Sequence, residues 1–520
     1  MERSTSQTKS ELIRGAASLS LAALLVKILG VAYKIPLSHI LGDDGMGYFN
    51  TAYTVYTFFF LLCTAGVPKA IAILISENSK SKNSSTGALL KTAKHTFIIT
   101  GTALAVLFAF TAFPISGLIG NKRAAFAMIT IAPAIPFIAG ASVYRGSLNG
   151  YMRFGTVAIS QFIEAALKLI LGLAISAIGI HHNLPSEHIA AGAVSGITWG
   201  SIITYIYLAI SSKKVIKVKN AGQSCKFNKS LLNKIFRISL PTTLSSGVMS
   251  LVNIIDLTLI MRGLEKAGYT DSLSTMLYGN YTTLAVPMFN FILSVVTSIC
   301  VSALPILTEL SISKSEKCFE NSLVFASKLV AFFALPATIL FAFLPYEILV
   351  ILFDRGSVAL GAALLAILSP SVTAIAVLMI INTALEAQGR YTIPLLSMGV
   401  GGIVKIISSS LLLSETNLAI WGAPIGTLVS YLVSISFSFI VYHRCCGRVF
   451  TIARSFALST ACAAIAIIPT IALRDYLLSA NKTPLWSLCL LGFYGIVYFI
   501  VSFLGGNLPI KERNVCQNRQ

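Results

Sequence analysis

The stretch VALGAALLAILSPSVTAIAVLMIINTAL, residues 358–385, contains no charged residue. A hydrocarbon core of about 30 Å needs about 20 mostly apolar residues in helical form, so this stretch predicts a membrane-spanning helix. Thirteen further apolar stretches of similar character lie near 13–35, 48–76, 95–119, 124–144, 156–180, 189–211, 236–261, 280–306, 325–345, 393–413, 418–442, 453–473 and 485–505. We therefore expect an all-α polytopic membrane protein with about fourteen transmembrane helices.

The 39 Lys and Arg residues collect in every second connection between these stretches. With the N-terminus in the cytoplasm, 27 of them fall in cytoplasmic tails and loops, 7 fall outside and 5 fall within spans. This bias follows the positive-inside rule and predicts that the C-terminus is cytoplasmic as well. The net charge of +20 is spread over the loops, where it sets topology and contacts lipid headgroups. It therefore does not predict binding to nucleic acid.

Short motifs recur in the two halves of the chain, on either side of the long polar interruption from Ser211 to Arg237. The recurring sets are Arg153 with Lys168 and Arg390 with Lys405, Gly192-Ala193-x-x-Gly196 and Gly422-Ala423-x-x-Gly426, and Ile75-Ser76-Glu77 and Leu307-Thr308-Glu309. The offsets are 237, 230 and 232 residues. Six spans per repeat bring both repeats into the membrane from the same side, so we expect parallel repeats related by a pseudo-two-fold axis along the membrane normal.

This organisation predicts four regions. They are an N-terminal six-helix lobe at 1–211, a basic cytoplasmic linker at 212–235, a second six-helix lobe at 236–442, and two additional transmembrane helices with a cytoplasmic tail at 443–520. We expect the two lobes to face each other across a central cavity.

Five lysines are predicted to lie within spans, where a charge near the bilayer centre is costly. They are Lys27, Lys34, Lys69, Lys168 and Lys405. Lys27 and Lys405 are near mid-span with no acidic residue one turn away, which predicts that they face a hydrated cavity. The others either line that cavity or, like Lys34 and Lys69, extend to a membrane interface.

The remaining polar candidates lie on two other predicted spans. Glu164 precedes Lys168 by four residues, a spacing that allows an ion pair on one helix face. Asn253 and Asp256 are one turn apart on the span that ends near Arg262. The carboxylates either neutralise lysines, tune their protonation or bind a coupling cation. A cavity lined by more cations than anions favours an anionic substrate.

Motifs for catalysis, cofactors and metals are absent from the sequence. There is no G-x-x-x-x-G-K-[ST] phosphate loop and no G-x-S-x-G elbow, and the nine cysteines form no C-x-x-C pair. We expect a transporter rather than an enzyme, with no catalytic residue, metal site or cofactor. Energy would come from a gradient, with Na⁺ or H⁺ as the candidate coupling cations.

Several motifs are similar to those of a known family. They are Lys27-Ile28-Leu29-Gly30, Gly42-Asp43-Asp44-Gly45-Met46-Gly47-Tyr48-Phe49-Asn50, Ala65-Gly66-Val67-Pro68-Lys69-Ala70, Pro241-Thr242-Thr243-Leu244, Tyr278-Gly279 and Ala384-Leu385-Glu386-Ala387-Gln388-Gly389. The chain resembles the polysaccharide-exporter branch of the multidrug/oligosaccharidyl-lipid/polysaccharide flippase superfamily. The resemblance implies a bacterial plasma-membrane flippase for an undecaprenyl-pyrophosphate-linked sugar precursor, working by alternating access, with a role in spore cortex peptidoglycan synthesis.

Two departures from the lipid II flippases of that superfamily concern the cargo. Those proteins carry an essential Arg in an R-x-L-G step that matches Lys27 here, and Lys keeps the charge but acts as a point charge rather than a bidentate fork. They also carry an Asp-Arg step shortly before a proline, where this chain reads Asn280-Tyr281-Thr282-Thr283 ahead of Pro287. Either the cargo differs from lipid II, or other cations such as Lys168 and Lys405 hold its pyrophosphate.

Two alternative functions stay open. One is a cation-coupled multidrug exporter of the same fold. The other is a non-transporting membrane scaffold that recruits cell-wall synthesis enzymes through its basic loops. The expected partners are a lipid-linked anionic sugar substrate, membrane lipids and, for the scaffold, those enzymes.

Overall fold

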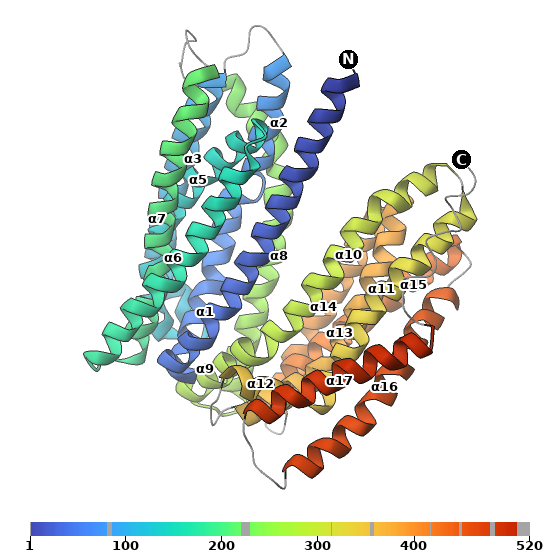
Figure 1. The fold of residues 1–520 in the computed structure, drawn as a ribbon. Helices are drawn as coiled ribbons and strands as arrows, with labels where there is room; N and C mark the ends of the chain where they lie inside the picture. The colour runs from blue at the N-terminus through green and yellow to red at the C-terminus, as the bar shows by residue number, and fades with distance from the viewer. Residues whose placement is uncertain are drawn as a thin grey trace. The chain divides into compact units, whose positions relative to one another are not determined.

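The computed structural model describes residues 2–80, 86–219, 229–313, 315–353, 358–415, 418–446, 450–478 and 484–506. Every regular element in these residues is helical, which confirms the predicted all-α class. Lipid offers no hydrogen bonds to the backbone, and a helix satisfies its own backbone groups within one segment. Figure 1 traces the helices in chain order.

The chain forms two compact units. The first holds Met1–Arg262 together with Thr270–Gly279. Its elements are α1 (Glu2–Thr64), α2 (Val67–Lys80), α3 (Thr86–Ile119), η1 (Lys122–Ala124), α4 (Ala125–Ile131), α5 (Ala134–Gly150), α6 (Phe154–His181), α7 (Ser186–Lys219), most of α8 (Lys229–Lys266) and nearly all of α9 (Asp271–Asn280). Within it, α6 packs against α1 and α7, and α5 packs against α2, α3 and α7.

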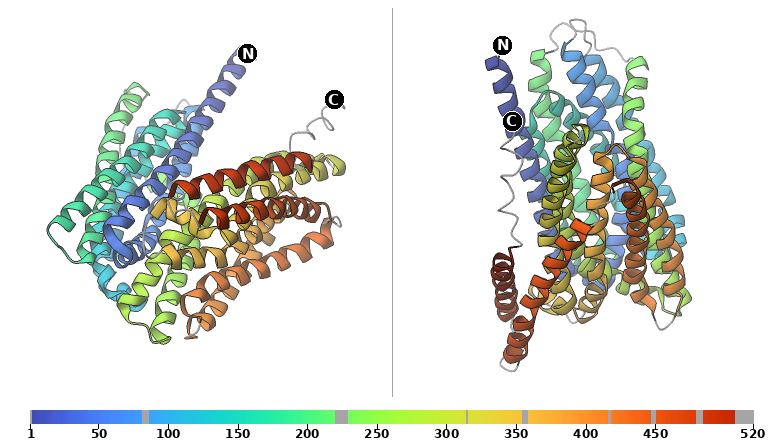
Figure 2. Two further views of the ribbon diagram at one scale, coloured as in Figure 1. Left: turned by 60° about the horizontal axis from the view of Figure 1, so that its bottom comes forward. Right: turned by 90° about the vertical axis from the view of Figure 1, so that its right-hand side faces the viewer.

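The second unit holds Gly263–Tyr269 and Asn280–Gln520. Its elements are η2 (Tyr281–Ala285), α10 (Val286–Ile312), α11 (Glu316–Phe343), α12 (Pro345–Phe353), α13 (Val358–Ala387), α14 (Thr392–Leu413), η3 (Ala419–Trp421), α15 (Gly422–Cys446), α16 (Phe450–Leu478) and α17 (Pro484–Leu504). Here α13 packs against α10, α11 and α15, while α16 packs against α11 and α17. Figure 2 gives two further views of these helices.

The boundary between the compact units lies inside α8, after Arg262. The predicted lobes at 1–211 and 236–442 instead meet at the basic linker 212–235, of which 220–228 lie outside the described residues. The division into six-helix lobes, and the separate region 443–520, stay predictions.

Twelve helices of the described residues are long and apolar enough to cross a membrane, or up to thirteen if the bent pair Lys122–Ile131 and Ala134–Gly150 is one span. Each predicted span from 95–119 onward coincides with one of these helices or with the bent pair. The predicted spans 13–35 and 48–76 both fall on α1 and α2, where the described apolar stretch runs from Ala32 to Ser76. The helical membrane architecture is therefore confirmed, while the count of fourteen stays a prediction.

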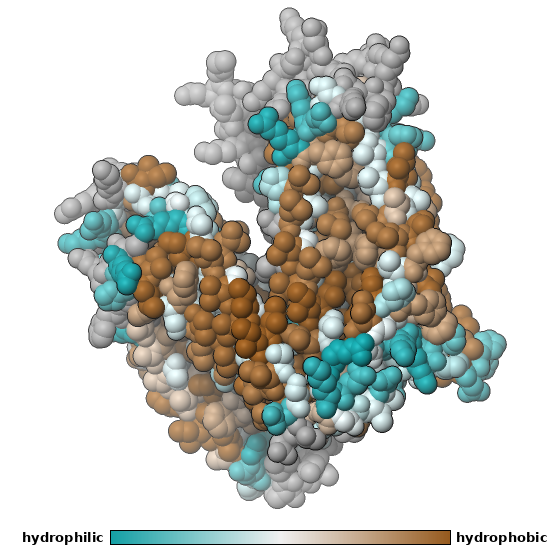
Figure 3. All heavy atoms as spheres, turned by 180° about the vertical axis from the view of Figure 1, so that it is seen from behind, coloured by the Kyte–Doolittle hydropathy of each residue, from teal (hydrophilic) through white to brown (hydrophobic). Residues whose placement is uncertain are grey.

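Large apolar side chains cover the outer faces of these helices as well as their contacts. Phe110 is 80% exposed and Leu504 is 78% exposed. On the face drawn in Figure 3, brown apolar residues follow the flanks of the helices and teal polar residues gather toward their ends. Apolar surface on this scale is unusual for a water-soluble monomer, and it identifies a multi-pass membrane protein.

A glycine kink divides α1 into two arms. Gly42 has a φ of 67° and a ψ of −178°, a region that is accessible essentially only to glycine. Lys34 and Asn50 lie on opposite sides of the kink, and a straight helix would place residues 16 positions apart at about 24 Å. Instead Lys34 Nζ donates to Asn50 Oδ1 at 3.5 Å. The kink therefore brings the two arms alongside each other.

Two helix pairs pack in the same register. A Cβ added to Gly196 of α7 would lie 2.7 Å from Gly172 Cα of α6, and a Cβ added to Gly426 of α15 would lie 3.3 Å from Ser409 N of α14. These partners are offset by 230 and 237 residues, as are the sequence motifs. The neighbouring contacts of Gly192 with Ile175 and Gly422 with Leu412, and of Gly200 with Glu164 and Gly401 with Ser430, keep the same offsets.

The turns that lead into α6 and α14 match as well. Arg153 N donates to Leu148 O at 2.8 Å, and Arg390 N donates to Leu385 O at 3.0 Å. The residue before each arginine has a positive φ, 58° in the first turn and 79° in the second. A repeat of turn and helix pair is therefore present in each unit.

A π-helical turn at Tyr281–Ala285 was not predicted from the sequence. Val286 N–H donates to Tyr281 O in this turn, which is the five-residue spacing of a π-helix. Pro287 lacks the N–H that an α-helix would use to bond Thr283 O, so the regular pattern cannot continue there. The turn directly follows the unit boundary at Gly279.

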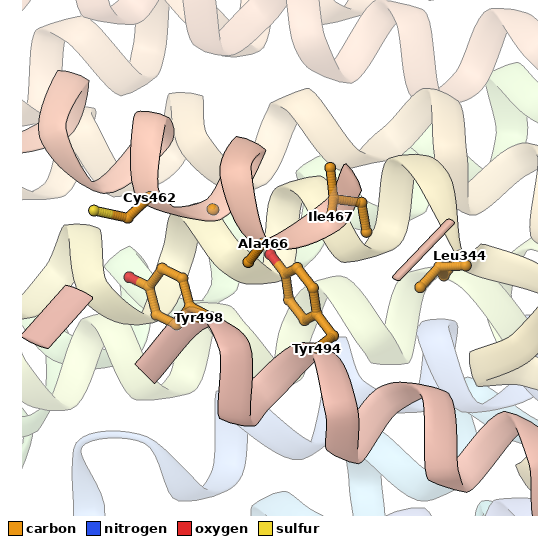
Figure 4. Close-up of a cluster of buried hydrophobic side chains, with 7 residues drawn as sticks. Leu344, Cys462, Ala466, Ile467, Tyr494 and Tyr498 are labelled. Atoms are coloured by element: carbon orange, nitrogen blue, oxygen red, sulfur yellow. The ribbon is translucent and has the colours of Figure 1, made fainter. Parts of the chain in front are cut away.

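The two C-terminal helices are fastened to α11 through a proline. Pro336 lies inside α11 and cannot donate to the carbonyl of Phe332, four residues earlier. Tyr498 Oη donates to Phe332 O at 3.1 Å, and Tyr494 Oη donates to Pro336 O at 3.1 Å. Figure 4 shows both tyrosines of α17 in a buried cluster with residues of α16 and with Leu344. These hydroxyls supply hydrogen bonds where the proline interrupts the helix.

Replacing Gly42 with Ala should strain the kink and destabilise the first unit, because a side chain in this backbone region costs about 1–3 kcal/mol. We expect Gly42→Ala to lower the thermal unfolding midpoint of the detergent-solubilised protein. Gly402→Ala is the control, since a Cβ there meets no atom within 4 Å and the backbone is helical. Equal midpoints in both variants would contradict the kink.

Replacing Tyr498 with Phe should destabilise the second unit, because a buried carbonyl without a partner costs about 1–3 kcal/mol. The thermal unfolding midpoint should fall in Tyr498→Phe and stay unchanged in Tyr391→Phe, whose ring is 64% exposed. A midpoint for Tyr498→Phe as high as that of the control would show that the hydroxyl contributes nothing at Pro336.

Candidate functional site

Two of the predicted lysines meet in the first unit. Lys34 lies on the first arm of α1 and Lys168 lies on α6, and the two ammonium groups are close enough to repel each other. Both side chains are half-buried. Lys34 reaches Asn50 across the kink, and Asn50 is 5% exposed. A pair of positive charges is therefore held inside a bundle of apolar helices.

Aromatic rings of α1 surround the Lys168 ammonium. Its Nζ lies 4.5 Å from the ring centroid of Tyr53 and 5.5 Å from that of Tyr33, distances within the range of a cation–π interaction. Tyr33 is held in place because its hydroxyl donates to Ala193 O at 3.1 Å. A Cβ on Gly172 would lie 2.6 Å from that hydroxyl, so the glycine makes room for the tyrosine.

The rings form a continuous wall along the second arm of α1. Phe49 stacks on Tyr53 with centroids 6.0 Å apart, and Tyr53 lies 6.0 Å from Tyr56. Tyr53 is 36% exposed, whereas Phe49 and Tyr56 are buried. Sequence analysis did not select these residues, although their spacing of three and four positions is the signature of one helix face. Tyr53 is therefore the accessible ring of this wall.

The expected ion pair between Glu164 and Lys168 is not formed. Glu164 Oε2 instead lies 2.6 Å from Arg145 Nη2, and the side chains of Arg145 and Glu164 are 15% and 25% exposed. Arg145 Nε also donates to Ser160 Oγ at 3.1 Å. The guanidinium offers two geometrically fixed donors, whereas an ammonium is a point charge, so arginine is the better partner for this carboxylate.

Arg145 was missed because the sequence placed it in a cytoplasmic loop. The apolar run was taken to end at residue 144, but α5 continues to Gly150. Gly150, next to Asn149, was the available signal, because helices commonly stop at such residues. The extra turn and a half of helix carries Arg145 into the bundle, where it faces α6.

The other predicted site residues are distributed over both units. Arg262 Nε donates to Leu118 O at 2.9 Å, so its guanidinium binds the C-terminal carbonyls of α3, where a cation is favoured. Asp256 is half-buried on α8 and close to the buried Tyr278. Exposed positions are taken by Asn253 on α8 and Lys69 on α2, half-buried Lys405 lies on α14 of the second unit, and the side chain of Lys27 on α1 lies outside the described residues.

Comparison with known proteins places this arrangement among membrane transporters. The chain is 26% identical over 312 residues to stage V sporulation protein B of Bacillus subtilis (strain 168), a match that covers 58% of this chain and 59% of that relative. It is 22% identical over 457 residues to the lipid II flippase MurJ of the same organism, with 84% of each chain covered. The chain thus spans about three fifths of the first relative's length and most of the second's.

Solved structures share the fold. Lipid II flippase MurJ in an inward closed conformation gives a TM-score of 0.72 at 17% identity, over 94% of this chain and 98% of that one. An inward-facing multidrug resistance MATE family transporter of the MOP superfamily gives 0.66 at 15% identity, over 83% and 98%. Residues 12–311 also match the family model described as polysaccharide biosynthesis protein. Because this match covers more than half of the 520 residues, the chain belongs to the polysaccharide biosynthesis protein family.

Proposed function

We propose that this protein is a flippase that moves an undecaprenyl-pyrophosphate-linked sugar precursor, similar to lipid II, across the bacterial plasma membrane. Its product would serve spore cortex peptidoglycan synthesis, in line with the sporulation protein among its relatives. The N- and C-termini would lie in the cytoplasm, where the positive-inside rule puts them.

The observation that carries the proposal is the pair Lys34 and Lys168. Two ammonium groups that repel each other inside a bundle are stabilised by a ligand with two negative charges, and a pyrophosphate diester is such a ligand. Charged groups in a partly buried setting form stronger hydrogen bonds than neutral ones. The exposed ring of Tyr53 lies next to these charges, where the first sugar would be held.

Transport would proceed by alternating access. The headgroup enters from the cytoplasmic side while the polyprenyl tail stays in lipid, and a rocking of the two halves then opens the site outward. Lys27 and Lys405 remain proposed headgroup contacts, with Lys69 and Arg262 as secondary ones. Asp256 and Asn253 are proposed to bind a coupling cation, Na⁺ or H⁺.

Removing the Lys168 charge should abolish most of the transport. A hydrogen bond to a charged group is worth about 1.5–3 kcal/mol, so we expect Lys168→Met to weaken headgroup binding by about 10- to 100-fold. Outward exposure of a labelled lipid-linked precursor in proteoliposomes measures this. Lys122→Met, at an exposed position of η1, is the control and should keep wild-type transport. Wild-type transport by Lys168→Met at normal abundance would remove Lys168 from the site.

A drug exporter is the second candidate, favoured by the fold shared with a multidrug resistance transporter. Two lysines beside each other disfavour an amphipathic cation, because like charges repel at short range. Cells that express the protein should therefore accumulate a cationic dye as fast as cells without it. Slower dye accumulation that depends on the protein, with no effect on the lipid-linked precursor, would replace the flippase with the exporter.

A further inference from the structure

Glu164 competes with any anionic ligand for the charge of Lys168. It precedes Lys168 by four residues on α6, and Glu before Lys at this spacing is the favourable orientation for an ion pair on a helix. Such a pair would neutralise the lysine and block it for a ligand. In the structure this pair is replaced by the ion pair of Glu164 with Arg145.

The side chain of Arg145 is itself held in a defined orientation. Ser160 is fully buried and its hydroxyl donates to Val157 O at 2.7 Å. The proton of this hydroxyl is thereby engaged, and its oxygen is left to accept from Arg145 Nε at 3.1 Å. The guanidinium thus has one donor fixed on Ser160 and another fixed on Glu164.

We propose that Arg145 is a positioning residue for anion binding, which keeps Glu164 away from Lys168 and so leaves the Lys168 charge to the ligand. The inference rests on the proposed function. Arg145 and Glu164 neutralise each other, so Lys34 and Lys168 together contribute two positive charges, which balances the two negative charges of a pyrophosphate diester. Arg145 itself does not touch the ligand.

The consequence for the ligand follows from the charges. Without Arg145, Glu164 is a partly buried carboxylate without a counterion, and such a group pairs with the nearest cation. The Lys168 ammonium is one turn away on the same face of α6. Pairing would cancel one of the two charges that a pyrophosphate needs, although no residue of the binding site had been changed.

A double substitution separates this role from a merely structural one. The full-length protein in detergent is titrated with undecaprenyl pyrophosphate, and binding is measured by native mass spectrometry for wild type, Arg145→Leu, Glu164→Gln and the double variant. We expect Arg145→Leu to bind at least about tenfold more weakly. Glu164→Gln should bind like wild type, and the double variant should recover wild-type affinity because no carboxylate is left to compete.

Each other result overturns a defined statement. An Arg145→Leu protein that binds like wild type, or a double variant as weak as Arg145→Leu, would refute the positioning role. If Arg145→Leu does not fold, Arg145→Lys together with the neutral double variant carries the test, since both should fold and bind. Absence of binding by the wild type would instead contradict the proposed function.

Discussion

A carboxylate inside a helix bundle must be paired, and here Arg145 rather than Lys168 pairs with Glu164. The positive charges of Lys168 and Lys34 are therefore not cancelled by the acidic residue nearest to Lys168 on α6. The other features of the first unit support this arrangement. The Gly42 kink brings Asn50 to Lys34, and tyrosine rings of α1 cover the Lys168 ammonium. A site for an anion results from the choice of partner for one acid.

The helix pairs α6–α7 and α14–α15 show how one scaffold carries two different surroundings. Their contacts keep the same register at offsets of 237 and 230 residues, so Lys168 and Lys405 occupy equivalent places. Gly172, one turn after the first lysine, makes room for the Tyr33 hydroxyl, while its counterpart Ser409 lies against Gly426. The packing of the repeat is thus preserved, while the contact with an aromatic ring from α1 is a feature of the first pair.

Apolar length predicted nearly every membrane helix, because lipid imposes a single rule on the backbone, and the family motifs predicted the fold. The partners of charged side chains could not be predicted in the same way. Spacing along α6 favoured Glu164 with Lys168, but a residue on another helix, Arg145, decides the pairing. The π-helical turn at Tyr281–Ala285 was missed although Pro287 was the available signal, because its cause lies in helix hydrogen bonding rather than in hydrophobicity.

The central claim is that this protein recognises the charge of a lipid-linked headgroup through two uncancelled lysines. The most direct measurement compares the affinity of the purified wild-type protein for undecaprenyl pyrophosphate, undecaprenyl phosphate and undecaprenol at one ionic strength. The account predicts affinity that falls in this order, with the largest value for the pyrophosphate and a loss of the difference as salt screens the charges. Equal affinity for the neutral alcohol and the pyrophosphate would contradict it.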